Sequence, residues 1–361
     1  MTVINVLTKG FSSPNGCAFL FPLIKHQQVL MDCGITLHFH KKITKKLYDC
    51  DTLFVESKFF SRDWAQHTPR VLLTFELLRQ HVEKIFYFDI NDSTGWPHAR
   101  VLPYVDRYVK NQALKNKLLY LKPFYGHRIY TDYYHRVFNV MDKEEIFSEV
   151  IADASLLDKL IIGWNSGLAD YSCYGPYRMG LYNKMPISHL LTYPVRFTEV
   201  QRQRVNELSC RMGISYVRDS IAWQRRQIRE KLKSFGHVKT DKLSRRQYYR
   251  ELEESKLVVS PFGLGEITLK DFEVFLTGGL LVKPDMTHME TWPNFFQDSE
   301  TMVSFNWDLD NIQERLQTVL SDYKKYIDIA EYGQDRYRHY LSSPEAPTLF
   351  ADHFLNMLNS G

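Results

Sequence analysis

Short apolar runs alternate with longer segments of helical periodicity along this chain. In the first half, runs rich in β-branched and aromatic residues occupy positions 3–7, 35–39, 52–56, 71–75 and 84–88. The segments between them have room for crossover helices, and the turn-rich stretch 10–16 follows the first run. This order predicts parallel strands joined by helices, as in a doubly wound sheet.

A second series begins where the strand-like run 159–162 leads into a glycine loop ending at Gly167. We expect a helix at 199–212, a strand at 214–217, and helices at 221–234 and 245–255. The chain from about residue 311 reads as helical, with a break at 343–347. These patterns predict an N-terminal domain at 1–155, a C-terminal domain at 156–335 and a helical tail at 336–361.

The segment 257–283 carries the clearest chemical signal. An apolar strand leads into a loop with Gly263 and Gly265, a helix whose N-cap is Thr268, and a second strand after a glycine pair. The amide groups at such a helix start can bind a phosphate. Lys270 and Glu273 share one helix face, which suits a phosphate and a ribose diol respectively. The alternative is an exposed Lys–Glu ion pair on an ordinary amphipathic helix.

The stretch 248–283 resembles the donor half of GT-B glycosyltransferases. A helix leads into an apolar strand, and a basic residue, an acid and a glycine turn follow. The resemblance implies an α/β chain with two Rossmann-like domains facing a cleft. It also implies that Glu273 binds the donor ribose and Lys270 the phosphates. The basic residue lies three positions before the acid, as in phage DNA glucosyltransferases and exostosin-like enzymes. Many retaining members have two glutamates eight apart, whereas Glu266 and Glu273 are seven apart, so the role of Glu266 stays open.

Inverting transfer needs a general base, which we expect at the end of a strand of the first domain. The run 84–92 offers Asp89 at the strand end and Asp92 just beyond it. The segment 88–90 is also similar to the strand end that carries the base in phage DNA glucosyltransferases. The alternative is that both aspartates cap a turn. Were the reaction retaining, a carboxylate could act as a nucleophile or a stabiliser.

Two further sets of residues are candidates for binding. The second glycine loop adds Trp164, Asn165 and Gly167 to the predicted donor site. The acceptor candidates come from the first turn and from a tyrosine-rich segment: Gly10, Ser12, Ser13 and His135. The arginine-rich run 223–233 could contact phosphates or form the solvated face of a helix.

Composition narrows the function classes. The chain has 361 residues, 44% of them hydrophobic, and a net charge of +4. Five widely spaced cysteines indicate neither a zinc site nor a disulfide framework. We therefore predict no cofactor, no metal requirement, and a cytoplasmic location, with the inner membrane face as an option.

These observations favour a glycosyltransferase that moves a sugar from a nucleotide-sugar to a glycan or lipid-linked acceptor in polysaccharide synthesis. The alternatives are a glycosyltransferase that modifies nucleic acid and a non-catalytic nucleotide- or partner-binding module.

Overall fold

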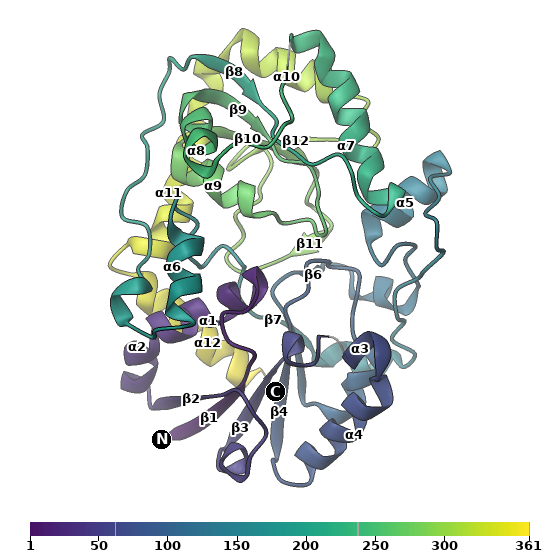
Figure 1. The fold of residues 1–361 in the computed structure, drawn as a ribbon, viewed down its shortest axis with the longest axis vertical. Coiled ribbons are helices and arrows are strands. Elements are labelled where there is room, and N and C mark those ends of the chain that lie inside the picture. The colour runs from purple at the N-terminus through teal and green to yellow at the C-terminus, as the bar shows by residue number, and fades with distance from the viewer. Residues whose placement is uncertain (62, 237, 361) are drawn as a thin grey trace.

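The computed structural model describes residues 1–61, 63–236 and 238–360, and it contains two parallel sheets (Figure 1). The N-terminal sheet has six strands, all parallel to their neighbours. In spatial order they are β2 (Ile35–His40), β1 (Thr2–Leu7), β3 (Thr52–Glu56), β4 (Lys84–Asp89), β5 (Arg107–Lys110) and β7 (Leu160–Ile162). The order reverses direction between β1 and β3, where ligands of such sheets bind at the carboxyl ends of the strands.

Both faces of this sheet are buried, which is why its strands are almost continuously apolar. Phe54, Phe86 and Phe88 face a core that includes α1 (Pro14–Lys25) and α12 (Ala346–Asn359). Val55 and Tyr87 face a second core beneath α4 (Thr68–Arg79). Because neighbouring residues of a strand point to opposite faces, a run of apolar residues supplies both layers.

The C-terminal sheet has four parallel strands. In spatial order they are β12 (Val303–Phe305), β10 (Leu280–Pro284), β9 (Ser255–Val259) and β8 (Asn206–Ser209). One face packs against α7 (Asp219–Lys231), α10 (Ile312–Ser321) and the first half of α11 (Tyr323–Ser342), and the other against α9 (Leu269–Thr277) and the second half of α11. Parallel sheets covered by helices on both faces confirm the predicted α/β class with two Rossmann-like units.

The remaining elements complete or join the two units (Figure 1). Two short antiparallel strands, one near each unit, pair through Ala113 with Glu290 and Leu114 with Met289. The helices are α2 (Gln27–Asp32), α3 (Asp63–Gln66), α5 (Ile129–Phe138), α6 (Gly175–Tyr182) and α8 (Arg245–Glu254), and the two short strands are β6 (Ala113–Leu114) and β11 (Met289–Glu290).

The last helix returns the chain to the N-terminal unit. Phe354 on α12 packs against Phe54 of β3, and Phe350 packs against Trp164. One apolar core therefore runs from the N-terminal sheet through these helices to the C-terminal sheet. The predicted helical character from about residue 311 is confirmed up to Asn359, and the break between α11 and α12 covers 343–345 rather than 343–347. Gly361 lies outside the described residues.

Several predicted elements are wrong. Residues 71–75 belong to helix α4, because Val71, Phe75 and Leu78 form a helical stripe rather than an alternating one. The predicted helix 199–212 contains strand β8, and 214–217 forms no strand.

The strand-like run at residue 160 is β7, which pairs with β5 in the N-terminal sheet rather than opening the second unit. The exact residues at which the chain divides into domains stay a prediction.

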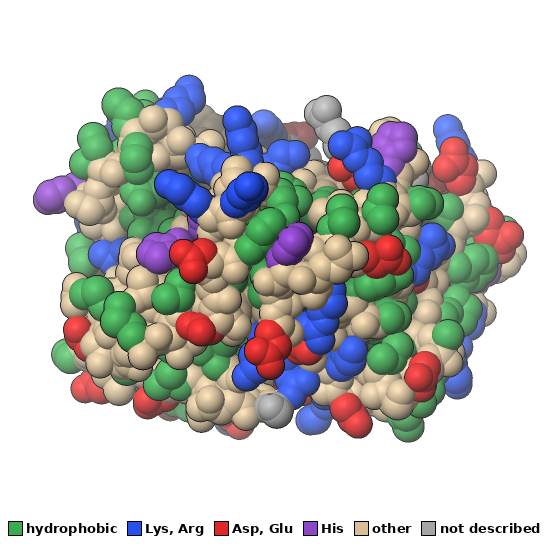
Figure 2. Space-filling view, turned by 90° about the horizontal axis from the view of Figure 1, so that it is seen from below, with side chains coloured by type: hydrophobic (Ala, Val, Ile, Leu, Met, Phe, Trp, Pro, Cys, Tyr) green, Lys and Arg blue, Asp and Glu red, His purple; other side chains and the backbone are tan. Residues whose placement is uncertain are grey.

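Among the described helices, none combines the length and the apolar character needed to cross a bilayer. Figure 2 shows the molecule from the end formed by the N-terminal unit. Several lysine and arginine side chains gather in one region of this face, and acidic side chains are scattered elsewhere on it. Charges of both signs on one face agree with the small net charge of +4.

Candidate functional site

The glycine loop between β9 and α9 lies at the carboxyl edge of the C-terminal sheet. Helix α9 begins as predicted: the amide of Thr268 donates to Asp271 Oδ2 at 2.8 Å. Asp271 also pairs with Lys283 at 3.0 Å, and both side chains are fully buried. A carboxylate therefore already occupies the electropositive end of this helix, so a phosphate nearby would depend on other cations.

Two such cations flank the loop. The ammonium group of Lys270 donates to the carbonyls of Arg211 and Val259, and burial lowers the pKa of Lys270 to about 8. Arg225, from helix α7, donates to the carbonyl of Phe262 and lies beside Gly263. Within the described residues, neither cation forms a salt bridge with a carboxylate. Positive charge held beside a glycine loop suits a phosphate group.

Glu273 pairs with Arg245 rather than with Lys270. Its Oε1 lies 3.2 Å from Arg245 Nη2, and the side chain of Glu273 is 7% exposed. Burial raises the pKa of Glu273, while Arg245 and the hydroxyls of Tyr248 and Tyr249 oppose that shift. Glu273 is buried and pairs with Arg245, whereas the Lys270 ammonium donates to backbone carbonyls. The alternative of an exposed Lys270–Glu273 ion pair is therefore wrong.

A pocket of about 450 Å³ opens beside this group. It lies where the chain leaves β8, and its wall includes Arg245 and Tyr248 of helix α8. The other lining residues are Arg211, Met212, Gly213, Thr240, Asp241, Lys242 and Leu243. An aromatic ring, apolar stems and cations around one hollow are suitable for a planar base with attached phosphates.

The glycine loop also contacts the N-terminal unit. A side chain at Gly265 would collide with the carbonyl of Asp92 at 1.9 Å, so only glycine fits this contact. Next to it, Glu266 is fully buried and accepts from the hydroxyl of Thr94 at 2.6 Å and from its amide at 3.1 Å. Gln112 is a third donor, at 3.3 Å. Glu266, whose role the sequence left open, therefore joins the loop to the first unit.

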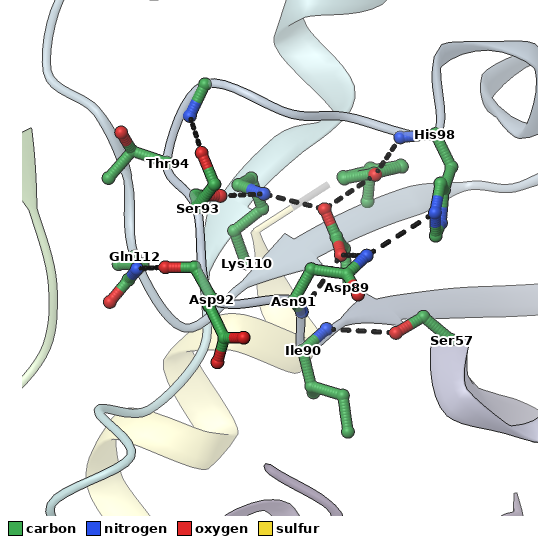
Figure 3. A network of polar contacts seen from close by, with 12 residues as sticks. Ser57, Asp89, Ile90, Asn91, Asp92, Ser93, Thr94, His98, Lys110 and Gln112 are labelled. Atoms are coloured by element: carbon green, nitrogen blue, oxygen red, sulfur yellow. Dashed lines mark hydrogen bonds and ion pairs between the residues drawn. The ribbon is translucent and has the colours of Figure 1, made fainter. Parts of the chain in front are cut away.

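Asp89 lies at the end of β4 inside a network of polar contacts (Figure 3). Its Oδ2 is 2.6 Å from Lys110 Nζ and 2.9 Å from the hydroxyl of Tyr108, and Asn91 donates to Oδ1 at 2.7 Å. Burial raises the pKa of Asp89, but Lys110 and His98 outweigh it and leave the pKa below its usual value. Asp89 is wholly enclosed, so these contacts support a structural role, and its assignment as a base stays a prediction.

Asp92 differs from Asp89 in being partly exposed. Its carboxylate points away from the Asp89 network (Figure 3). Oδ1 accepts a hydrogen bond from Asn15 Nδ2 at 3.0 Å, and its neighbour across the units is Gly265. Of the two predicted bases, Asp92 is thus the one that the fold brings next to the predicted donor loop.

Glu56 is a third strand-end carboxylate, which the sequence analysis missed. It ends β3, and its Oε2 accepts from the hydroxyl of Thr8 and from the amide of Lys9 at 3.2 Å. Its Oε1 is buried and has no hydrogen-bond partner among the described residues. Burial raises the pKa of Glu56 to about 7 despite these bonds and the nearby Lys58. The signal was present in the sequence, because an apolar strand ends in an acid here just as at Asp89.

The predicted donor residues of the second glycine loop are packed inside the protein. Trp164 stacks on Phe19, and both amide atoms of Asn165 are hydrogen-bonded within the chain. Gly167 lies against the ring of Phe272, where a Cβ would be 2.4 Å away. These contacts support a packing role where the two units meet, and donor binding by Trp164, Asn165 and Gly167 stays a prediction.

The predicted acceptor residues do not all come together. Ser13 caps helix α1 by accepting from the amide of Gly16, and Gly10 turns with a φ of +74° beside Lys41. Ser12 is exposed in the same loop. His135 belongs to α5, which lies well apart from α1 in Figure 1, and its ring stacks on Tyr125. The structure therefore separates His135 from the other three.

No three histidine, cysteine, aspartate or glutamate side chains of the described ranges are grouped as metal ligands would be. The candidate residues that the sequence analysis missed are Arg245 and Tyr248, which line the pocket beside Glu273. Arg225 belongs to the arginine-rich run that the sequence analysis named as a possible phosphate contact, and the fold places it beside the glycine loop.

No protein-family model and no curated protein sequence matches this chain. Among solved structures, a glycosyltransferase from Rickettsia africae is 9% identical with a TM-score of 0.47, covering 100% of this chain and 99% of that one. HepE from Anabaena, in complex with UDP-glucose, is 8% identical with a TM-score of 0.45 and full coverage of both chains. An alpha-glucosyltransferase in complex with UDP and DNA is 9% identical with a TM-score of 0.39, covering 98% and 99%. Since each of these TM-scores is below 0.5, the likenesses establish neither family nor function.

Proposed function

We propose that this chain is a glycosyltransferase of the GT-B type that uses a nucleotide-sugar donor. The observation that carries the proposal is the group around the glycine loop. Glu273 and Arg245 lie beside a pocket of about 450 Å³, and Lys270 and Arg225 lie next to the loop itself. A nucleoside diphosphate requires a carboxylate to bind its diol and cations to bind its phosphates, and in the described part of the chain Lys270 and Arg225 form no salt bridge that would compete.

In this mechanism the nucleotide binds to the C-terminal unit. Glu273 accepts hydrogen bonds from the ribose hydroxyls, and Lys270 and Arg225 stabilise the negative charge that develops on the leaving phosphate. The bond between the sugar carbon and the phosphate oxygen breaks, and an acceptor hydroxyl oxygen bonds to that carbon. For an inverting reaction, Asp92 is the proposed base that takes the hydroxyl proton, because it is the partly exposed carboxylate beside the loop.

The proposed acceptor is a glycan or a lipid-linked saccharide of a surface polysaccharide, bound by the first loop of the N-terminal unit. A nucleic-acid acceptor is less favoured, since two arginines of α7 already pair with carboxylates. Arg226 pairs with Asp219 and Arg229 with Glu230. A nucleic-acid acceptor would bind far more weakly as salt rises, whereas a neutral glycan would not.

The first experiment is thermal stabilisation of the protein by UDP, GDP, dTDP, CMP and ADP, with and without a divalent metal. A ligand at a hundred times its Kd adds about 2.7 kcal/mol to the free energy of unfolding. We expect one nucleotide to stabilise the protein, and Glu273→Ala to lose that effect.

Glu254→Ala is the matched control, because Glu254 is a partly exposed acid at the end of the neighbouring helix, where it pairs with Arg250. If no nucleotide raises the melting temperature of the wild type, the donor site is wrong. If a nucleotide does so equally in both variants, it binds elsewhere.

A further inference from the structure

The first loop of the N-terminal sheet is held by a chain of hydrogen bonds that starts at Glu56. The hydroxyl of Thr8 donates to Glu56 Oε2 and accepts from the amide of Gly10 at 3.0 Å. The amide of Lys9 donates to the same carboxylate oxygen at 3.2 Å. Glu56 thus sets the direction of the Thr8 hydroxyl, and that hydroxyl fixes the turn at Gly10.

This relay occupies the reversal point of the sheet, where β1 and β3 lie side by side. The carboxyl ends of strands at such a point form the ligand-binding crevice of parallel sheets. The loop that leaves β1 carries Gly10, Ser12 and Ser13, the proposed acceptor residues. The Gly10 turn has a φ of +74°, which other residues adopt only with strain, so it depends on local bonds to keep its shape.

Glu56 itself is fully buried, with Oε1 turned toward the backbone at Gly16. The charged and titratable groups that influence it are Lys9 on the loop, Lys58 after β3 and Cys17 on α1. The side chain of Lys58 donates to Asn91 at 2.6 Å, and no described cation forms a salt bridge with Glu56. The carboxylate therefore has one strong set of partners, the donors of the loop.

We propose that Glu56 is a positioning residue that orders the acceptor loop, residues 8–13, through the Thr8 hydroxyl and the Lys9 amide. The acceptor role of the loop rests on the proposed function, whereas the relay does not. Glu56 does not touch the acceptor. In its ionised form it accepts both hydrogen bonds more strongly than a neutral acid does. Because the pKa of Glu56 is raised to about 7, the loop is firmest above neutral pH and loosens as the acid gains a proton.

The relay is tested without any substrate by amide hydrogen exchange at Lys9 and Gly10. Corrected for intrinsic rates, the wild type should lose about tenfold protection at these amides between pH 8 and pH 6, because hydrogen bonds to charged groups are about twice as strong as neutral ones. Glu56→Gln should show the same protection at both pH values. Equal pH dependence in the wild type and Glu56→Gln would overturn the proposal.

A second pair of variants keeps the test independent of how well Glu56→Gln folds. Thr8→Val removes the hydroxyl and should speed exchange at Gly10 about tenfold, whereas Thr8→Ser retains the relay and should leave it unchanged. Protection at Gly10 that is the same in both variants would overturn the relay.

The acceptor role has its own readout. With an active enzyme, Glu56→Gln should raise the acceptor KM several-fold at pH 8 and leave the donor KM unchanged. An unchanged acceptor KM would overturn the positioning role while the proposed function stands. Absence of turnover with every nucleotide-sugar would remove the proposed function and the acceptor role together, and the exchange data would still decide the relay.

Discussion

Asp89 and Glu56 end adjacent strands of one sheet, yet their surroundings give them opposite charge behaviour. Both side chains are fully enclosed, and each follows a strand of apolar residues. Asp89 lies opposite Lys110 in the strand register and pairs with it at 2.6 Å. Glu56 lies opposite Phe88, and its partners within the described residues are a hydroxyl and an amide. The pKa of Asp89 is held low, and that of Glu56 is raised to about 7.

The difference teaches that a cation in direct contact, together with further hydrogen-bond donors, favours the ionised form of a buried carboxylate. Asn91 shows how closely the two sites approach each other. Its side chain donates to Asp89 and accepts from Lys58, so the Lys58 ammonium is directed toward the Asp89 network. A strand-end acid with a charged partner is a structural element, and one without it can respond to pH.

The largest effect should follow from removing the cation of the paired site. Lys110→Met leaves Asp89 buried without its partner, which should cost about 3–5 kcal/mol in the free energy of unfolding, measured by urea at pH 7. The double variant Asp89→Asn/Lys110→Met should be less destabilised than Lys110→Met alone.

Lys233→Met is the control, since its ion pair with Glu230 is exposed and screened by solvent, so its loss should have little effect on stability. If Lys110→Met and Lys233→Met lower the free energy of unfolding equally, the buried Asp89–Lys110 pair contributes no more to stability than the exposed pair.

A smaller effect should appear in the pH dependence of stability. Between the ordinary pKa of 4.5 and about 7, the folded chain keeps a proton on Glu56 that the unfolded chain has lost. Stability from this group therefore falls as pH rises through that window, by at most about 3 kcal/mol. Asp89 works in the opposite direction, because its lowered pKa contributes stability that is lost only in acid.

We expect the free energy of unfolding of Glu56→Gln, relative to that of the wild type, to be higher at pH 8 than at pH 5. The exposed Glu83→Gln serves as the control. A constant difference between Glu56→Gln and wild type at both values would contradict the raised pKa.

A loss of about 1–2 kcal/mol is expected when the hydrogen-bonding partner of Asp89 is removed. The buried hydroxyl of Tyr108 donates to Asp89 and accepts from the amide of His98 at 2.7 Å. Tyr108→Phe leaves that amide without its partner, which carries a desolvation cost. Thermal or urea unfolding measures the loss, with the exposed Tyr332→Phe as the comparison. No loss would indicate that water replaces the hydroxyl.

The smallest effect concerns Lys58, whose charge lowers the pKa of Glu56. Lys58→Met should raise that pKa above about 7 by no more than about one unit, because the ammonium is directed toward Asn91. Carbon-13 NMR of labelled glutamate, assigned with Glu56→Gln, follows the carboxyl directly. A shift of several units would show that Lys58 is the true partner of Glu56 and would end the contrast with Asp89.

The C-terminal unit shows where sequence reasoning succeeded. The start of α9 at Thr268 and the shared face of Lys270 and Glu273 follow from spacing within a few residues, which the sequence displays directly. The partners of those residues could not be predicted, because they lie far away in the sequence. Arg245 is 28 positions from Glu273, and Arg211, whose carbonyl bonds Lys270, is 59 positions away.

The N-terminal unit shows where local patterns were insufficient. The same rule, an acid at the end of an apolar strand, selected Asp89 and passed over Glu56. Run 71–75 was predicted as a strand because five residues do not distinguish a buried strand from one face of a helix. The sequence also does not reveal that Trp164 stacks on Phe19 or that the ring of Phe272 lies against Gly167, so the packing of this loop could not be predicted.

The sequence by itself determined the α/β class, most strands, and the local motif that carries Lys270 and Glu273, because these depend on periodicity and on residues a few positions apart. The tertiary structure alone decided which acids have cations beside them, which glycines are in contact with other chain segments, and which arginines reach the glycine loop. Strand register and crossover connections bring together residues that are far apart in the sequence. Burial then strengthens the electrostatic interaction within each pair, because the protein interior screens charges less than water does.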